Sequence, residues 1–196
     1  MTLIETVAED AADDAVAVLY AGARESMGFV PNSLSAFSLR PEVYAAWEQL
    51  KSAIAGGMDA RRYELATLAA ARTLRSSYCC LAHGKVLADR FLDAGAVREL
   101  ALGSTPADLD EAEVAIMAFA EQVAGDASSI TEADIQALRD VGLSDRDIFD
   151  VVAAAAARCF FSKTLDAVGA EPDAAFADLE PGLREALTVG RPIEQG

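Results

Sequence analysis

Apolar residues recur every three to four positions along most of the chain, which is the spacing of one buried face of an α-helix. Proline, glycine and capping residues divide this pattern into separate helices. No sustained alternation of apolar and polar residues is present, so no β-strand is predicted. The pattern therefore predicts an all-α fold, a helical bundle. The expected helices span about residues 9–27, 41–56, 60–74, 78–92, 110–124 and 145–168, with one more that begins after Thr131.

The boundaries of these helices follow from local chemistry. Pro31 disfavours helix at the residue before it, so residues 28–32 are expected to form a loop. Pro41 suits a first helical turn, and Asp59 can cap the helix that follows it. Thr131 with Asp134, and Ser144 with Asp147, have the spacing of capping boxes.

A chain of 196 residues with 53% hydrophobic content is long enough for one core, so residues 1–196 are predicted to form a single domain. Residues 58–62 and 143–147 are similar, and each precedes an Ala-rich helix. This internal echo leads to the hypothesis of two related helical hairpins within the bundle.

The formal net charge of −16 argues against nucleic acid as a partner, because phosphate binding needs clustered Lys and Arg. It also disfavours anionic membrane surfaces. No run of about 18 apolar residues is present, so no membrane-spanning segment is predicted. The first residues lack a basic segment followed by an apolar one, so no signal peptide is expected, and a cytoplasmic location is the default expectation.

The chain has three cysteines, Cys79, Cys80 and Cys159, and one histidine. An odd, small number of cysteines in a reducing compartment is not a disulfide framework. The thiols lack paired spacing and only one His is available, so no zinc site is predicted. Cys80 and Cys159 have apolar neighbours and are expected to pack in the core.

Cys79 falls in the first turn of the predicted helix 78–92, where free amides and the helix dipole favour a thiolate. His83 lies one turn later on the same face, and a neutral imidazole there can take the thiol proton. Glu64 has apolar neighbours on its own helix face, so its carboxylate is expected to be buried and to need a partner. If the two helices form a hairpin, His83 is that partner. The three residues then provide a nucleophile, a base and an orienting acid.

This spacing resembles the alkylhydroperoxidase D-like (AhpD-like), or carboxymuconolactone decarboxylase, family. That family carries a Glu, a CxxC motif starting twelve residues later, and a His four residues past the second Cys; here these positions hold Glu64, Ser76-Ser77-Tyr78-Cys79 and His83. The resemblance covers about residues 22–173 and leaves 174–196 as a tail. It implies an AhpD-like bundle in which Cys79 attacks a hydroperoxide and His83 and Glu64 form a proton relay, with no metal or other cofactor.

The resemblance also implies a homo-oligomer, commonly a trimer or a dimer of trimers (a hexamer), with the tail expected at a subunit interface. One position departs from the family pattern: Ser76 stands where the family has its resolving cysteine. A hydroxyl cannot form a disulfide, so we expect an external thiol as the reductant. Cys80 is a poor substitute, because a disulfide between neighbours is strained. Cys159 can resolve the oxidised thiol only if the fold brings it beside Cys79.

Two other functions remain open at this point. One is decarboxylase or lactone chemistry on an anionic substrate, for which Arg61, Arg62, Arg72 and Arg75 are available near the site. The other is a non-catalytic helical oligomer that binds a partner and has lost turnover, for which Ser76 is the main support.

Overall fold

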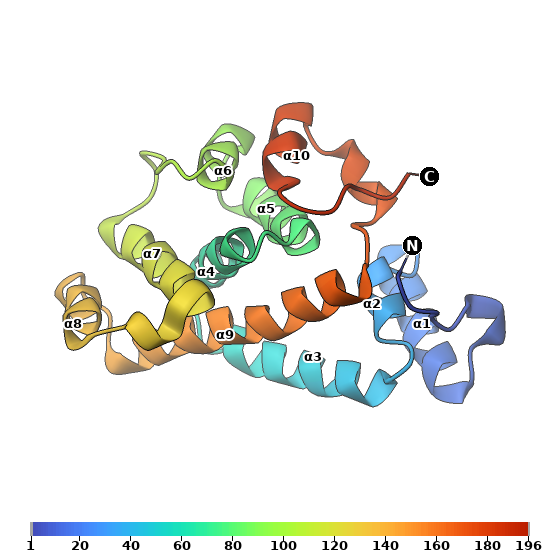
Figure 1. The fold of residues 1–196 in the computed structure, drawn as a ribbon. Helices are drawn as coiled ribbons and strands as arrows, with labels where there is room; N and C mark the ends of the chain where they lie inside the picture. Colours follow the sequence, from blue (N-terminus) through green and yellow to red (C-terminus); the bar gives the residue numbers. More distant parts are fainter. Residues whose placement is uncertain (1, 196) are drawn as a thin grey trace.

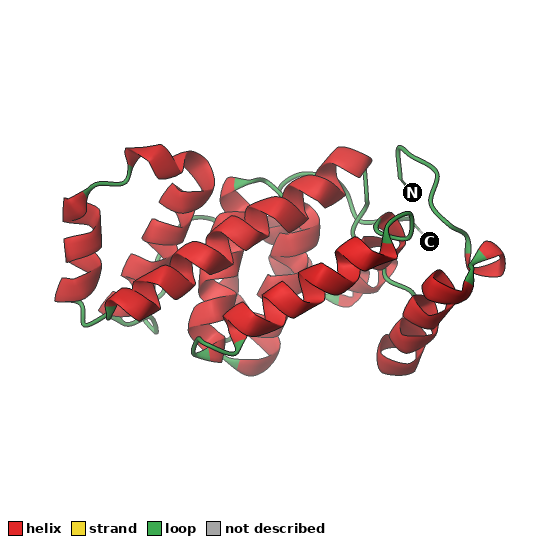
Figure 2. Ribbon diagram, turned by 90° about the horizontal axis from the view of Figure 1, so that it is seen from below, coloured by secondary structure: helices red, strands yellow, loops and turns green. Residues whose placement is uncertain are grey.

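The computed structural model describes residues 2–195, and this part of the chain folds into α-helices joined by loops and short 3-10 turns, with no β-strand. Figure 2 shows this arrangement from below, with helices in red and loops in green. The prediction of an all-α fold is confirmed. The α-helices are α1 Asp14–Met27, α2 Asn32–Ala36, α3 Pro41–Ala55, α4 Ala60–Thr73, α5 Ser77–Arg90, α6 Ala94–Ala101, α7 Glu111–Asp126, α8 Glu132–Asp140, α9 Asp145–Val168 and α10 Pro181–Leu187.

Helix α4 is the centre of the bundle, because it packs against α5, α7 and α9. Its side chains from Leu65 to Ala71 are buried, which explains the dense Ala and Leu content of this segment. The longest helix, α9, runs beside α3 along one side of the molecule, while α10 covers α5 and α6 (Figure 1). None of the helices within residues 2–195 has the length and apolar content needed to cross a bilayer.

Three helices that have a clear capping pattern in the sequence begin where predicted. Ser144 and Asp147 form a capping box at the start of α9, and Thr131 and Asp134 form one at α8. The Asp59 side chain accepts a hydrogen bond from the Arg62 amide at the start of α4. Each of these caps satisfies amides that the first helical turn leaves without partners.

Three helices, α2, α6 and α10, are absent from the sequence prediction. Gly95 lies beyond the predicted helix 78–92, in the first turn of α6, whose N-cap is Asp93. The segment 174–196 is expected to be a tail without helix, yet it contains α10, which begins with Pro181 at its first position. Leu183 and Leu187 of α10 are fully buried within this chain. An additional contact of the tail with a neighbouring subunit stays a prediction.

The contact between α10 and α5 leads to a stability prediction. A Cβ atom added at Gly84 of α5 would lie 2.6 Å from Leu187 Cδ1, and Leu187 is fully buried and cannot move aside freely. We expect Gly84→Ala to lower the free energy of unfolding by about 1–3 kcal/mol. Denaturant unfolding at equilibrium measures this change.

The control is Gly22→Ala in α1, because nothing lies within 4 Å of a Cβ added there. This change should raise stability slightly, since Ala favours helix over Gly. The double variant Gly84→Ala/Leu187→Ala should be less destabilised than the sum of its single changes, because the truncation makes room for the new methyl group. Equal stability of Gly84→Ala and the wild type would contradict the close packing of α10.

Candidate active site

Cys79 lies in the first turn of α5 and is only 1% exposed. It nevertheless borders a cavity of about 290 Å³, to which α3, α5 and α9 and the segments before α2 and after α9 contribute. The wall is mostly apolar and contains six aromatic side chains: Phe29, Tyr44, Trp47, Tyr78, Phe161 and Phe176. A small organic molecule of apolar character therefore fits this space better than a large polar one does.

His83 borders the same cavity one turn along α5, and its Nδ1 atom lies 2.6 Å from Oε2 of Glu64 on α4. Both side chains are largely buried, with 13% and 15% of their surfaces exposed. The prediction that a helical hairpin brings Glu64 to His83 is confirmed by this contact. An Nδ1–H that donates to the carboxylate leaves Nε2 with a free lone pair, which is the form a general base needs.

The pKa of His83 is lowered from 6.5, first by burial and then by the positive charge of Arg158, and the Glu64 carboxylate opposes these effects only in part. The imidazole is therefore favoured in its neutral form. The unfolded chain takes up this proton as the pH falls through 6.5, whereas the folded chain does not. Stability should consequently decrease as the pH falls from 6.5 towards the lowered pKa.

A His83→Gln variant should lose this part of the pH dependence, which amounts to at most about 1.4 kcal/mol for every tenfold difference in proton affinity between the folded and unfolded chains. Thermal unfolding of both proteins between pH 7 and pH 5 measures the difference. Asp166 and Asp173 have pKa values raised by burial and act with the opposite sign at lower pH, so the comparison with the variant is essential. Parallel curves for the two proteins would contradict a buried neutral His83.

The polar partner of Cys79 comes from α9 and was missed in the sequence. Within residues 2–195, the group in hydrogen-bond range of the Cys79 sulfur is Nη1 of Arg158, at 3.6 Å, and not the His83 ring. Arg158 is 4% exposed, and its guanidinium carbon lies 5.5 Å and 5.4 Å from the ring centroids of Trp47 and Phe161. The available signal was a single arginine on the apolar face of the longest helix.

The arginines that sequence analysis placed near the site lie elsewhere. Arg61 pairs with Glu113 at 2.7 Å and Arg72 pairs with Glu121, and neither borders the cavity beside Cys79. Arg75 lies in the turn between α4 and α5 and reaches towards the carbonyl of Val189. The expectation that these side chains serve an anionic substrate at this site is wrong, because their helix faces point to other neighbours.

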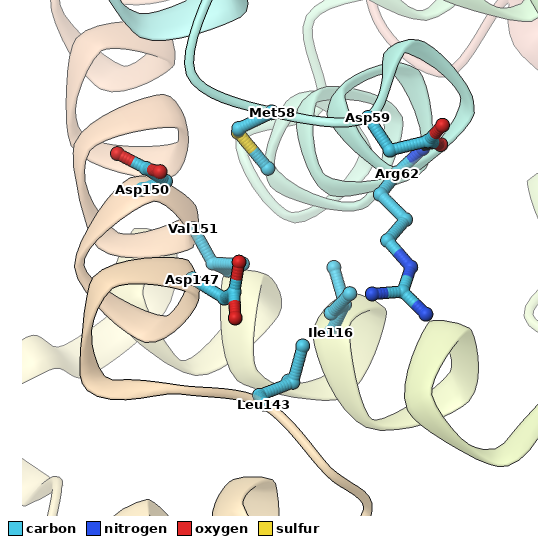
Figure 3. Close-up of a pocket in the computed structure, with 8 residues that line it drawn as sticks. All are labelled: Met58, Asp59, Arg62, Ile116, Leu143, Asp147, Asp150 and Val151. Carbon is cyan, nitrogen blue, oxygen red and sulfur yellow. Dashed lines mark hydrogen bonds between the residues drawn. The ribbon is translucent and has the colours of Figure 1, made fainter.

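Arg62 borders a separate small cavity of about 80 Å³, where the starts of α4 and α9 meet (Figure 3). Met58 and Asp59 lie on one side of it and Leu143 and Asp147 on the other, so the two similar sequence segments face each other there. The lining contains no cysteine or histidine among the described residues. This cavity does not share the chemistry of the Cys79 site, and the hypothesis of related hairpins stays a prediction.

The other two thiols are also free. Cys80 is 1% exposed, and burial raises the pKa of its thiol, which confirms the prediction of a core cysteine. Cys159 is partly buried and packs against the main hydrophobic cluster. Ser76 is fully buried, and the tail closes over this end of α5 because the Gly190 amide donates to Ser77 Oγ at 2.7 Å.

A hydrogen-bond network joins the cavity wall to the loop before α2. The Tyr78 hydroxyl donates to Asp173, and the same carboxylate accepts from the Asn32 amide at 2.7 Å. The Ser33 amide donates to the Tyr78 oxygen at 3.2 Å. Burial raises the pKa values of both Tyr78 and Asp173. These hydrogen bonds connect α5 to the start of α2 and to the segment after α9.

Part of the chain that contains this site is similar to a known protein family. Residues 41–122, which include α4, α5 and their three predicted site residues, match the model of the carboxymuconolactone decarboxylase family. Over this segment, the chain is similar to the carboxymuconolactone decarboxylase family. No curated protein matches the sequence. The family match thus covers Glu64, Cys79 and His83 but not Arg158.

Solved structures with the same AhpD-like fold extend the similarity to most of the chain. An AhpD-core, peroxidase-related protein from Ralstonia eutropha JMP134 is similar with a TM-score of 0.80 and 24% identity, covering 89% of this chain and 94% of that protein. A peroxidase-related protein from Silicibacter sp. TM1040 is similar with a TM-score of 0.76 and 22% identity, covering 88% and 94%. The debrominase Bmp8, in complex with 2,3,4-tribromopyrrole, has a TM-score of 0.72 and 17% identity, covering 95% and 96%.

Proposed function

We propose that this protein is a thiol-dependent peroxidase that reduces an organic hydroperoxide at Cys79. The observation that carries the proposal is that Cys79 and His83 border one largely apolar cavity and that His83 contacts Glu64 behind it. A nucleophile, a base and an orienting acid in one buried site form an arrangement typical of covalent catalysis. The fold shared with peroxidase-related proteins also supports it.

The proposed reaction begins when His83 takes the proton of the Cys79 thiol, directly or through water in the cavity. The thiolate attacks the terminal oxygen of the hydroperoxide, so that a sulfur–oxygen bond forms as the oxygen–oxygen bond breaks. The sulfur loses two electrons and the peroxide gains them. His83 returns its proton to the leaving alkoxide, which departs as an alcohol, and Cys79 remains as a sulfenic acid.

A thiol from outside the chain completes the cycle, because Ser76 cannot form a disulfide with Cys79. The first thiol condenses with the sulfenic acid to give a mixed disulfide and water, and a second thiol releases Cys79. Dependence on such reductants supports a cytoplasmic location. Assembly as a homo-oligomer, a trimer or a hexamer, is part of the same proposal, and light scattering tests it: a monomer would contradict it.

The test uses the wild-type protein with one equivalent of cumene hydroperoxide or hydrogen peroxide. Mass spectrometry after trapping with dimedone measures the rate at which Cys79 becomes a sulfenic acid. We expect reaction at least about 100-fold faster than that of free cysteine, with preference for the aromatic peroxide because of the apolar cavity wall. Oxidation no faster than that of free cysteine would refute the proposal.

A second candidate is decarboxylase-type chemistry on an anionic substrate, which the buried charge of Arg158 beside the cavity favours. In that reaction the histidine and carboxylate act and the thiol is dispensable. Release of carbon dioxide from a small lactone carboxylate that persists in Cys79→Ser would support this candidate. A helical oligomer that only binds a partner would show neither activity while retaining its fold.

A further inference from the structure

Arg158 is the most deeply buried arginine among the ion-pairing and cavity-lining arginines of the described chain. Arg61 and Arg72 keep 26% and 23% of their side chains exposed, and each has a carboxylate partner. Arg158 is 4% exposed and has no carboxylate within ion-pair distance in residues 2–195. A buried cation is stable only when an anion or several acceptors compensate it. The position of Arg158 therefore requires an anion that the carboxylates of the chain do not supply.

The other charged groups around the cavity are already paired. Lys51 donates to Glu48 at 2.7 Å, and Asp173 accepts from Tyr78 and from the Asn32 amide. Among the described side chains, Arg158 is thus the cation bordering the cavity that has no carboxylate partner. The Cys79 sulfur lies within hydrogen-bond range of it, at 3.6 Å from Nη1.

The surroundings of Arg158 hold it in place without neutralising it. Its guanidinium lies over the rings of Trp47 and Phe161, which stack on each other with centroids 4.7 Å apart. Cation–π contacts of this kind orient a guanidinium and leave its N–H groups free for other acceptors. Its Nε atom is enclosed and without an acceptor, so the protein itself does not use all its donors. A guanidinium also keeps its proton in proteins, so this charge is permanent.

His83 is poorly suited to be the cation beside the sulfur. Burial and the charge of Arg158 both lower the pKa of His83, so the imidazole favours its neutral form. The imidazole carries a positive charge only while it holds the thiol proton, whereas the guanidinium carries its charge throughout. The site therefore separates two tasks, with proton transfer at His83 and positive charge at Arg158.

We propose that Arg158 is a catalytic residue whose guanidinium stabilises the Cys79 thiolate and the negative charge that develops on the leaving oxygen. This inference rests on the proposed function for its second part. As the sulfur–oxygen bond forms, negative charge moves from the sulfur to the alkoxide, and a guanidinium that borders the same cavity can stabilise it there. Fixed donors of this type stabilise the transition state because they need no reorganisation.

Alkylation of Cys79 tests the first part without any peroxide. Iodoacetate is an anion and iodoacetamide is neutral, so a permanent cation beside the sulfur accelerates iodoacetate selectively. We expect the ratio of the two rates in the wild type to exceed that of free cysteine by roughly tenfold. Benzoate, an apolar anion, should slow both reactions by occupying the cavity. A ratio equal to that of free cysteine in the folded wild type would overturn the inference and needs no variant.

Variants extend the test to the residue itself. Arg158→Gln should bring the alkylation ratio to that of free cysteine and lower the rate of peroxide oxidation by about 100-fold. Arg158→Lys should restore part of both, because the charge is retained while the planar fork is lost. Arg62→Gln removes the same charge at the small cavity of Figure 3 and should leave both readouts unchanged. Circular dichroism and thermal unfolding confirm that each variant is folded.

The outcomes separate the inference from the proposed function. A folded Arg158→Gln variant that keeps the wild-type alkylation ratio overturns the role of Arg158, whatever the peroxide result. A wild type that fails to react with peroxide, but whose alkylation ratio falls in Arg158→Gln, refutes the peroxidase proposal and supports Arg158 as the cation of Cys79. Loss of both readouts in Arg158→Gln, with partial return in Arg158→Lys, supports both.

Discussion

Replacing Cys79 by serine is expected to lower the rate of hydroperoxide reduction by about 10³-fold or more, because a neutral hydroxyl is a far weaker nucleophile than a thiolate. Serine is close in size to cysteine, so the 1% exposed site should keep its packing. Consumption of cumene hydroperoxide in the presence of dithiothreitol measures the rate. Unfolding curves that coincide with those of the wild type would show that the loss is chemical.

The matched controls are Cys80→Ala and Cys159→Ala. Burial raises the pKa of the Cys80 thiol, so this residue is a poor nucleophile although it adjoins Cys79. Cys159 packs against the hydrophobic core, next in sequence to Arg158. Both variants should keep peroxide reduction within about threefold of the wild type, as expected for substitutions outside the reacting groups. Full activity in Cys79→Ser, or loss of activity in Cys80→Ala alone, would place the reaction at another residue.

The second large effect is expected at the His83–Glu64 pair. His83→Gln should lower the oxidation rate of Cys79 by about 10²–10⁴-fold, because the general base is removed. Glu64→Gln should also be strongly impaired. An amide can donate to Nδ1 of His83, which places the ring proton on Nε2 and removes the lone pair that accepts the thiol proton. Stopped-flow measurement of Cys79 oxidation under single-turnover conditions gives the rate for each variant.

The pH dependence gives the two variants distinct signatures. Because the pKa of His83 lies below 6.5, the wild-type rate should stay level down to pH 6.5 and fall only at lower pH, where the imidazole takes up a proton. Glu64 raises the pKa of His83, so this fall should move to lower pH in Glu64→Gln. His83→Gln should lack it. A wild-type level of oxidation in His83→Gln would mean that the thiol proton leaves by another route.

The contact between Glu64 and His83 could be predicted because the sequence around each residue shows which face of its helix that residue occupies. The helical periods of α4 and α5 place both residues on faces that meet when consecutive helices form a hairpin. Arg158 could not be placed in the same way. It lies 79 positions from Cys79, and only the packing of α9 against α4 and α5 brings the two together. Its aromatic neighbour Trp47 comes from a third helix, α3, so no local spacing reveals the group.

In the fold, too, features set by neighbouring residues were predictable, whereas features set by contacts between distant segments were not. Helices α8 and α9 begin at capping boxes that four consecutive residues define, and both starts are confirmed. Helix α10 has seven residues and gains its stability from burying Leu183 and Leu187 on α5 and α6. Isolated helices of that length are not stable, so the sequence pattern alone was too weak to predict it.

The segment that contains α10 is needed for a stable fold, so a shortened form of this protein has to include it. The similarity seen in the sequence ends near residue 173, but a truncation there would remove Leu183 and Leu187 from the core and uncover Gly84 in the middle of α5. It would also remove the amide of Gly190 that binds Ser77, two residues before Cys79. The Gly84 face of α5 therefore depends for its burial on a segment that is synthesised after it, so this face stays uncovered in a nascent chain until that segment has left the ribosome.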